Sequence, residues 1–198
     1  MDNAIVIKME QITKRFGSVI ANEEVDLTIR KGEIHALLGE NGAGKSTLMN
    51  MLAGIYMPDA GSIFIKGKRV NLSSPKQAIA LGVGMVHQHF KLVDRLSAKD
   101  NIIAGQKGNF FITSRKVREN IERLCNQFGL KVELDKKVED MSVSEKQTLE
   151  ILKVLYRGAD ILILDEPTAV LTPQEVEKLF TIIRRMKDQG CAVIIITH

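Results

Sequence analysis

The residues of this sequence with the clearest chemical potential are GENGAGKS, at positions 39–46. The stretch matches the pattern G-x-x-x-x-G-K-[ST], with an apolar, strand-like segment before it and a helix-forming segment after it. Glycines let backbone N–H groups approach phosphates without an intervening Cβ atom, and the start of the helix adds partial positive charge. The alternative, a glycine turn with no ligand, would not require Lys45 and Ser46. In a nucleotide site, Lys45 is expected to contact the β- and γ-phosphates and Ser46 to bind Mg²⁺. The predicted nucleotide-binding residues of this loop are Gly39, Glu40, Asn41, Gly42, Ala43, Gly44, Lys45, Ser46 and Thr47.

Two carboxylates end a second stretch, ILILDE at positions 161–166. Asp165 closes an apolar strand and suits a contact with Mg²⁺, often through water. Glu166 is placed to polarise an attacking water molecule as a general base. Many strands end in acids, so a capped surface turn is the alternative when this pair is taken alone. Together with the phosphate-binding loop, the pair predicts hydrolysis of the bound nucleotide.

Polar residues also end two other apolar stretches, since Gln88 follows VGMVH and His198 follows VIIIT. The carboxyl ends of parallel strands border the ligand crevice of an α/β sheet. We therefore predict that Gln88 contacts Mg²⁺ and the attacking water and that His198 contacts the γ-phosphate; a satisfied polar residue is the alternative for each. His87 and His89 have no Cys or further His nearby, so no separate metal site is predicted. Phe16, in KRFG, is a candidate for stacking on adenine, with a core or surface aromatic as the alternative.

The segments that must position these residues alternate between strand and helix patterns. Apolar alternation or continuous apolar runs predict strands at 4–16, 25–29, 33–39, 61–70, 83–88, 160–166 and 191–197. Helical patterns follow the phosphate-binding loop, cover residues 74–82, and dominate between about residues 97 and 157. The outline is an α/β core with a helical insert.

Local signals mark several helix boundaries. Gly129 is expected to end one amphipathic helix in a left-handed conformation. The apolar face of that helix is formed by Val117, Ile121, Leu124, Cys125 and Phe128. A second helix starts near Ser142. The next helix has Thr172 as its N-cap, Pro173 at its first position, and Glu175 to complete a capping box.

The composition is that of a globular chain, with 44% hydrophobic and 26% charged residues among 198. The net charge of +4 and pI of about 9.0 fit a solvated Lys/Arg surface better than a nucleic-acid footprint. Cys125 and Cys191 are expected to be small buried hydrophobes that form no disulfide. The apolar runs are too short to span a bilayer, and no leader opens the chain. These features predict a cytoplasmic location, with any membrane role supplied through a partner.

Taken together, the motifs resemble the nucleotide-binding domain of an ATP-binding-cassette (ABC) ATPase, over essentially all 198 residues. The family's elements appear in order as an adenine-stacking aromatic (Phe16), a Walker A loop (39–46), a Q-loop (Gln88), a helical subdomain, a signature motif, a Walker B strand (161–165), a catalytic Glu166, a D-loop (168–172) and a switch histidine (His198). The resemblance implies a P-loop NTPase core, in which helices flank a parallel sheet and N-terminal strands form an antiparallel sheet. It also implies one domain over 1–198, with the helical subdomain of about 97–157 inserted, that hydrolyses ATP with Mg²⁺.

The segments VHQHFKLV and LYRGADILILDEPTAVLTPQE are similar in sequence to the ATPases of importers for simple sugars and nucleosides. In that group one polypeptide usually carries two such domains, and this chain resembles the first. The resemblance implies that each ATP lies between the Walker A loop of one domain and the signature motif of the other. The implied partners are membrane permease subunits, a second ABC ATPase domain and, indirectly, a solute-binding protein, at the inner face of the cell membrane. The family continues beyond the position of His198, so a domain truncated at its C-terminus is expected.

The signature motif departs from the family pattern. Where L-S-G-G-Q is usual, this chain has MSVSE at 141–145, and Thr172 occupies the position of the D-loop aspartate. Ser142 and Ser144 are still predicted to contact nucleotide, Ser142 as the family's phosphate-contacting serine. Ser142 and Glu145 also have the S-x-x-E spacing of a capping box, so a plain helix start is the alternative.

Two other functions compete with solute import. An ABC-type ATPase acting on nucleic acid or the ribosome is disfavoured, because the insert lacks the long coiled coil or zinc modules of DNA-repair relatives. A regulatory module with weak hydrolysis is disfavoured at this domain's own Walker A loop by Glu166 and His198, and favoured at the opposite site by the altered signature. No nucleic-acid partner is expected.

Overall fold

The computed structural model describes residues 4–105 and 114–197. The strands are β1 (Ile5–Phe16), β2 (Val19–Arg30), β3 (Ile34–Leu38), β4 (Ala60–Ile65), β5 (Lys68–Val70), β6 (Val83–Val86), β7 (Ile161–Asp165) and β8 (Ala192–Thr197). The helices are α1 (Lys45–Leu52), α2 (Pro75–Ala80), α3 (Ala98–Ile103), α4 (Ser114–Phe128), the 3₁₀ turn η2 (Val138–Asp140), α5 (Val143–Tyr156) and α6 (Pro173–Asp188).

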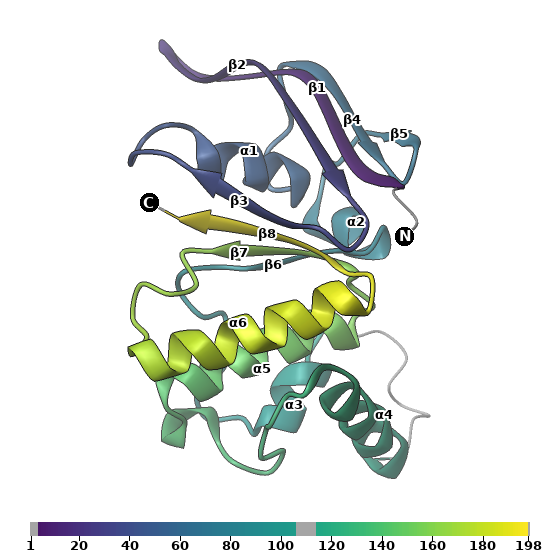
Figure 1. Cartoon of the computed structure of the whole chain (residues 1–198), viewed down its shortest axis with the longest axis vertical. Coiled ribbons are helices and arrows are strands. Elements are labelled where there is room, and N and C mark those ends of the chain that lie inside the picture. Colours follow the sequence, from purple (N-terminus) through teal and green to yellow (C-terminus); the bar gives the residue numbers. More distant parts are fainter. Residues whose placement is uncertain (1–3, 106–113, 198) are drawn as a thin grey trace.

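These elements form layers, as Figure 1 shows. The antiparallel sheet of β1, β2, β4 and β5 lies at one end of the molecule, and the parallel sheet of β3, β6, β7 and β8 lies in the middle. Helix α1 lies between the two sheets, while α5 and α6 cover the other face of the parallel sheet. Helices α3 and α4 lie beyond α5. The predicted α/β fold, with a parallel core and N-terminal antiparallel strands, is confirmed.

The antiparallel sheet corrects two predictions. Strand β2 begins at Val19, well before the predicted 25–29, and pairs along the length of β1. The predicted strand over 61–70 is in fact the hairpin of β4 and β5. Its turn residues Lys66 and Gly67 have φ values of 50° and 76°. Positive φ at both central residues is the geometry that matches the twist of paired strands, but Lys at the first position gives little sequence signal for it.

The parallel sheet has the order β3-β8-β7-β6, and its strands β6, β7 and β8 are largely buried on both faces, whereas the edge strand β3 is partly exposed. Along β7, Ile161 and Ile163 face the core that contains α1 and the antiparallel sheet. Leu162 and Leu164 face the other core, with α5 and α6. Because side chains alternate across a strand, a sheet covered on both sides needs a continuous apolar run, which is what the sequence has here.

The segment predicted to be a helical insert contains α3, α4, η2 and α5, although residues 106–113 lie outside the described part of the chain. Val117, Ile121 and Phe128 are buried on the predicted face of α4, and Gly129 follows with a φ of 70°. Among the described residues, no helix combines the length and apolar character needed to cross a membrane. The assignment of 97–157 as a separate subdomain stays a prediction.

Both predicted capping boxes are present. In α5, the Ser142 hydroxyl accepts from the Glu145 N–H at 3.2 Å, and the Ser142 N–H donates to the Glu145 carboxylate at 2.7 Å. In α6, Thr172 and Glu175 make the same reciprocal pair, with Pro173 in the first turn. Each box satisfies two N–H groups that a helix start otherwise leaves without partners.

Candidate active site

The phosphate-binding loop joins β3 to α1, and Gly44 lets its backbone turn into the helix. The φ of Gly44 is 82°, in the left-handed region. A Cβ atom at Gly44 would lie 2.1 Å from the Ala21 carbonyl oxygen and 2.7 Å from Nδ2 of Asn22, both on β2. Asn22 is buried and donates to the Gly44 carbonyl at 3.3 Å. Only glycine fits at position 44, and the loop is thereby held close against the antiparallel sheet.

Lys45 is the first residue of α1, and its side chain folds back over the loop. It is buried, and its Nζ donates to the carbonyl oxygens of Gly39 and of Glu40, the latter at 2.8 Å. In the described chain, α1 has no side-chain cap and no acidic residue in its first turn. The buried ammonium group and the helix N-terminus therefore make this loop electropositive, which suits a phosphate chain.

A cavity of about 190 Å³ lies over the loop. Its walls include residues 41–47 and Glu166, so the structure brings these predicted residues together. Val19, Ile20 and Ala21 of β2 complete the lining. Val19 is 63% exposed and Ile20 is 48% exposed, so both offer apolar surface beside the loop. The sequence pattern did not reveal them, because the predicted strand begins at residue 25, after the aliphatic pair.

The predicted Mg²⁺ residues Ser46 and Asp165 lie near each other, at the start of α1 and at the end of β7. Burial raises the pKa of the Asp165 carboxyl, and the charge of Glu166 adds to this, while His87, Ser46 and Lys45 oppose it. A divalent cation would favour the ionised form and offset the cost of burial. The described residues contain no cluster of three His, Cys, Asp or Glu side chains that would hold a metal ion alone.

Gln88 and Glu166 meet across two neighbouring strand ends. The Gln88 Nε2 donates to Oε2 of Glu166 at 3.1 Å. Gln88 follows β6 and Glu166 follows β7, which pair in parallel. Glu166 has a φ of 47°, a conformation that costs energy for a residue with a Cβ atom and that occurs at functional sites. Its N–H donates to Ile196 of β8 at 3.0 Å, which holds the backbone in place.

Phe16 lies at the end of β1 and does not line the cavity over the loop. Its ring packs edge-on against Tyr56, with centroids 5.2 Å apart and an interplanar angle of 74°. Lys14 Nζ lies 5.4 Å from the Phe16 centroid. Phe16 remains 43% exposed despite these two contacts. His198 lies outside the described residues.

Ser142 and Ser144 lie at the start of α5 and line no part of the cavity over the phosphate-binding loop. Ser142 caps the helix. Ser144 borders a different cavity of about 430 Å³, together with residues of α6. A hydrogen bond from Lys136 holds the pKa of Glu145 below its usual range, and the Ser142 N–H adds to the effect. Within one chain, the predicted signature residues are therefore separate from the phosphate-binding loop.

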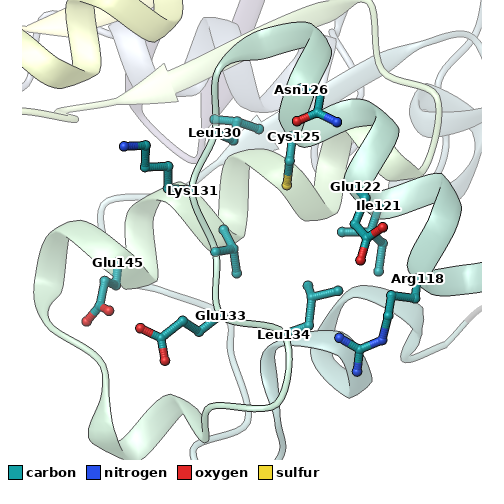
Figure 2. Close-up of a pocket in the computed structure, with 11 residues that line it drawn as sticks. Arg118, Ile121, Glu122, Cys125, Asn126, Leu130, Lys131, Glu133, Leu134 and Glu145 are labelled. Carbon is teal, nitrogen blue, oxygen red and sulfur yellow. The ribbon is translucent and has the colours of Figure 1, made fainter.

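A larger cavity of about 810 Å³ lies between α4 and the segment that follows it, and contains none of the loop residues. Figure 2 shows Arg118, Cys125 and Glu122 of α4 on one side and Glu133 and Leu134 on the other. Burial raises the pKa of the Cys125 thiol, with a further contribution from Glu122. A thiol that resists ionisation is a poor nucleophile, so the cavity does not activate Cys125 as one.

Comparisons with known proteins agree with this arrangement. The family model described as "ABC transporter" matches residues 22–169. The nucleoside import ATP-binding protein NupA of Lactococcus lactis subsp. cremoris is 51% identical over 100% of this chain and 40% of that protein. The guanosine import ATP-binding protein NupO of Bacillus subtilis is 49% identical over 96% of this chain and 38% of that protein. The chain thus spans about 40% of the length of these curated relatives.

Solved structures share the fold. A nucleotide-free ATP-binding cassette from an ABC transporter superposes with a TM-score of 0.86 at 23% identity, over 98% of this chain and 81% of that one. CbiO1 of Clostridium perfringens, part of the ABC transporter complex cbiONQ, gives 0.85 at 29% identity, over 98% and 79%. The ribose import ATP-binding protein RbsA of Caldanaerobacter subterraneus subsp. tengcongensis is 41% identical over 98% of this chain and 40% of that protein. Together, these relatives confirm the predicted resemblance to the ATPases of sugar and nucleoside importers. The chain belongs to the ABC transporter family.

Proposed function

We propose that the protein containing this chain binds ATP with Mg²⁺ and hydrolyses it to power import of a simple sugar or nucleoside. One observation carries the hydrolytic part: the electropositive loop and Glu166 line the same cavity, and Gln88 is hydrogen-bonded to Glu166. A phosphate chain bound along the loop would place its terminal phosphate next to a carboxylate that can act as a base.

Each residue of the site has its own role in ATP binding or hydrolysis. Gly39 to Thr47 wrap the phosphates, and Lys45 releases its hold on the Gly39 and Glu40 carbonyls to neutralise them. Glu166 accepts a proton from the attacking water, and Gln88 orients the Glu166 carboxylate. Phe16 stacks on adenine, and His198 contacts the γ-phosphate. Positioned polar groups of this kind lower the barrier because they need little rearrangement during the reaction.

Mg²⁺ fits the residues at the strand ends. The Ser46 hydroxyl and the Asp165 carboxylate lie near each other, and both are oxygen ligands. When bound, the ion would stabilise the negative charge of the phosphates. Gln88 reaches the same region from β6.

The import function is supported by the relatives named for nucleoside, guanosine and ribose import. Since this chain matches about 40% of their length, the rest of each relative has room for a second ATPase domain. The proposed partners are that second domain, membrane permease subunits and, indirectly, a solute-binding protein. The protein would then act on the inner face of the cell membrane.

Purification of the full-length protein from its own membranes tests the proposal. We expect a permease to co-purify and Mg-ATP hydrolysis to be stimulated in the complex. Identification of the partner by mass spectrometry and a malachite-green phosphate assay provide the readouts. An active ATPase that co-purifies with ribosomes or nucleic acid, and with no membrane protein, would contradict the import function.

The signature motif of this chain is proposed to act weakly on ATP held by the second domain. Val143 and Ser144 add Cβ atoms where the family has glycines, and Val143 is 41% exposed, so its side chain has no core to fill. In the full-length protein, replacing Val143 and Ser144 by glycine should raise hydrolysis at the site that this motif completes. The expected loss of stability is up to about 1 kcal/mol for each glycine placed in the helix.

Ser142→Ala should reduce hydrolysis at that same site and remove a helix cap worth about 1 kcal/mol. The measurement is ATPase activity with the other site silenced by its own catalytic substitution. Ser97→Ala is the matched control, because Ser97 caps α3 with a hydrogen bond from the Asp100 N–H at 3.2 Å. If Ser142→Ala behaves like Ser97→Ala and changes only the melting temperature, the motif is a helix cap without a role in hydrolysis.

A further inference from the structure

Helix α5 carries a buried ion pair that the proposed mechanism does not use. Glu150 is 5% exposed and Lys153 is 8% exposed, and Nζ of Lys153 lies 3.3 Å from Oε1 of Glu150. Charged side chains are seldom buried this deeply, because removing them from water costs more than one pairing returns. The pair therefore calls for a role beyond the interior of the helix.

Both members of the ion pair form hydrogen bonds with the backbone of one residue, Lys91, in the segment that follows β6. The Lys91 N–H donates to Oε1 of Glu150 at 2.8 Å, and Lys153 Nζ donates to the Lys91 carbonyl oxygen at 2.7 Å. The N–H and the carbonyl group of Lys91 are thus both bonded to side chains of α5. What the pair adds is a fixed position for the backbone three residues after Gln88.

One turn earlier, the same helix holds a second segment. Gln147 is 5% exposed, and its Nε2 donates to the Pro167 carbonyl oxygen at 2.7 Å. Pro167 directly follows Glu166. The spacing of three residues between Gln147, Glu150 and Lys153 keeps all three on one side of α5. From that side, α5 holds the backbone just beyond both members of the Gln88–Glu166 pair.

We propose that Gln147, Glu150 and Lys153 are positioning residues for hydrolysis, which hold the segments carrying Gln88 and Glu166 in register with each other. The inference rests on the proposed ATPase function. Gln88 and Glu166 are joined by one hydrogen bond of 3.1 Å, and small displacements of either segment would break it. Misplacement of a catalytic group by about 1 Å can lower the rate about 100-fold. The phosphate-binding loop lies on separate elements, β3 and α1, so ATP binding should not depend on α5.

The test is steady-state ATP hydrolysis by the full-length protein carrying Glu150→Leu with Lys153→Met, with the second domain's catalytic site silenced by its own substitution. Replacing both charges by apolar residues of similar size leaves no buried unpaired charge, so folding should survive. We expect kcat to fall about 10- to 100-fold while KM for ATP stays within about twofold and the melting temperature is retained. Lys153→Arg keeps a donor for both partners and should preserve most of kcat.

Arg118→Met is the matched control, since Arg118 and Asp135 form a long-range ion pair at 2.8 Å in the same helical part of the chain. It should leave kcat unchanged. Should the double variant not fold, Gln147→Met decides by the same measurement, because it removes only the bond to Pro167. Full kcat in a folded double variant, or in Gln147→Met, would overturn the positioning role alone. Absence of hydrolysis by the unsubstituted protein would instead overturn the proposed ATPase function.

Discussion

Glu166→Gln is expected to lower the turnover of ATP hydrolysis about 10²- to 10⁴-fold in the full-length protein. Glutamine keeps the shape of glutamate, and its carbonyl oxygen can still accept the hydrogen bond that Gln88 donates at 3.1 Å. The amide cannot accept a proton from water. The change therefore removes base chemistry and leaves the arrangement of the two strand ends in place. Phosphate release under saturating Mg-ATP measures the loss, and calorimetry should show that ATP still binds.

Glu177→Gln is the matched control for this substitution. Glu177 is exposed on α6, and its side chain makes none of the contacts described at the active site. The control should hydrolyse ATP at the unsubstituted rate. Near-normal turnover by Glu166→Gln, with the second domain's catalytic site silenced, would mean that another group accepts the proton.

Lys45→Ala should weaken Mg-ATP binding by an order of magnitude or more, since charge-assisted hydrogen bonds to phosphate are strong. The ammonium group is the positive side chain inside the loop, where it now bonds the Gly39 and Glu40 carbonyls. Without it, several phosphate charges would depend on backbone dipoles alone. The dissociation constant from isothermal titration calorimetry gives the magnitude.

Lys76→Ala provides the comparison, because Lys76 is exposed on α2 and lies outside the loop cavity. Since Lys45 also braces the loop, thermal melting without nucleotide should accompany the titration. A folded Lys45→Ala protein with an unchanged dissociation constant would refute the assigned role of Lys45.

The sequence by itself determined the parts of this protein that depend on close neighbours in the chain. The capping boxes of Ser142 with Glu145 and of Thr172 with Glu175 were predictable because each joins residues three positions apart. The phosphate-binding loop was predictable for a similar reason, since its glycines and the following helix specify a local turn. Continuous apolar runs likewise predicted the buried strands β7 and β8.

Local sequence patterns do not predict the structure where one stretch of sequence fits two different structures. GSIFIKGKRV reads as one strand or as a hairpin, and only pairing between β4 and β5 with positive φ at Lys66 and Gly67 decides for the hairpin. Val19 and Ile20 gave no alternation, so the early start of β2 depends on its pairing with β1. The roles assigned to Phe16, Ser142 and His198 stay predictions.

Only the tertiary structure decided which distant residues meet. The hydrogen bond between Gln88 and Glu166 joins positions 78 apart, because β6 and β7 are neighbours in the parallel sheet. The bond from Lys153 to Lys91 joins positions 62 apart and depends on how α5 packs. Hydrophobic periodicity tells which side of a helix is buried but not which backbone it will face. The sequence therefore supplied the chemical groups of the site, and strand order and helix packing determined how they are held together.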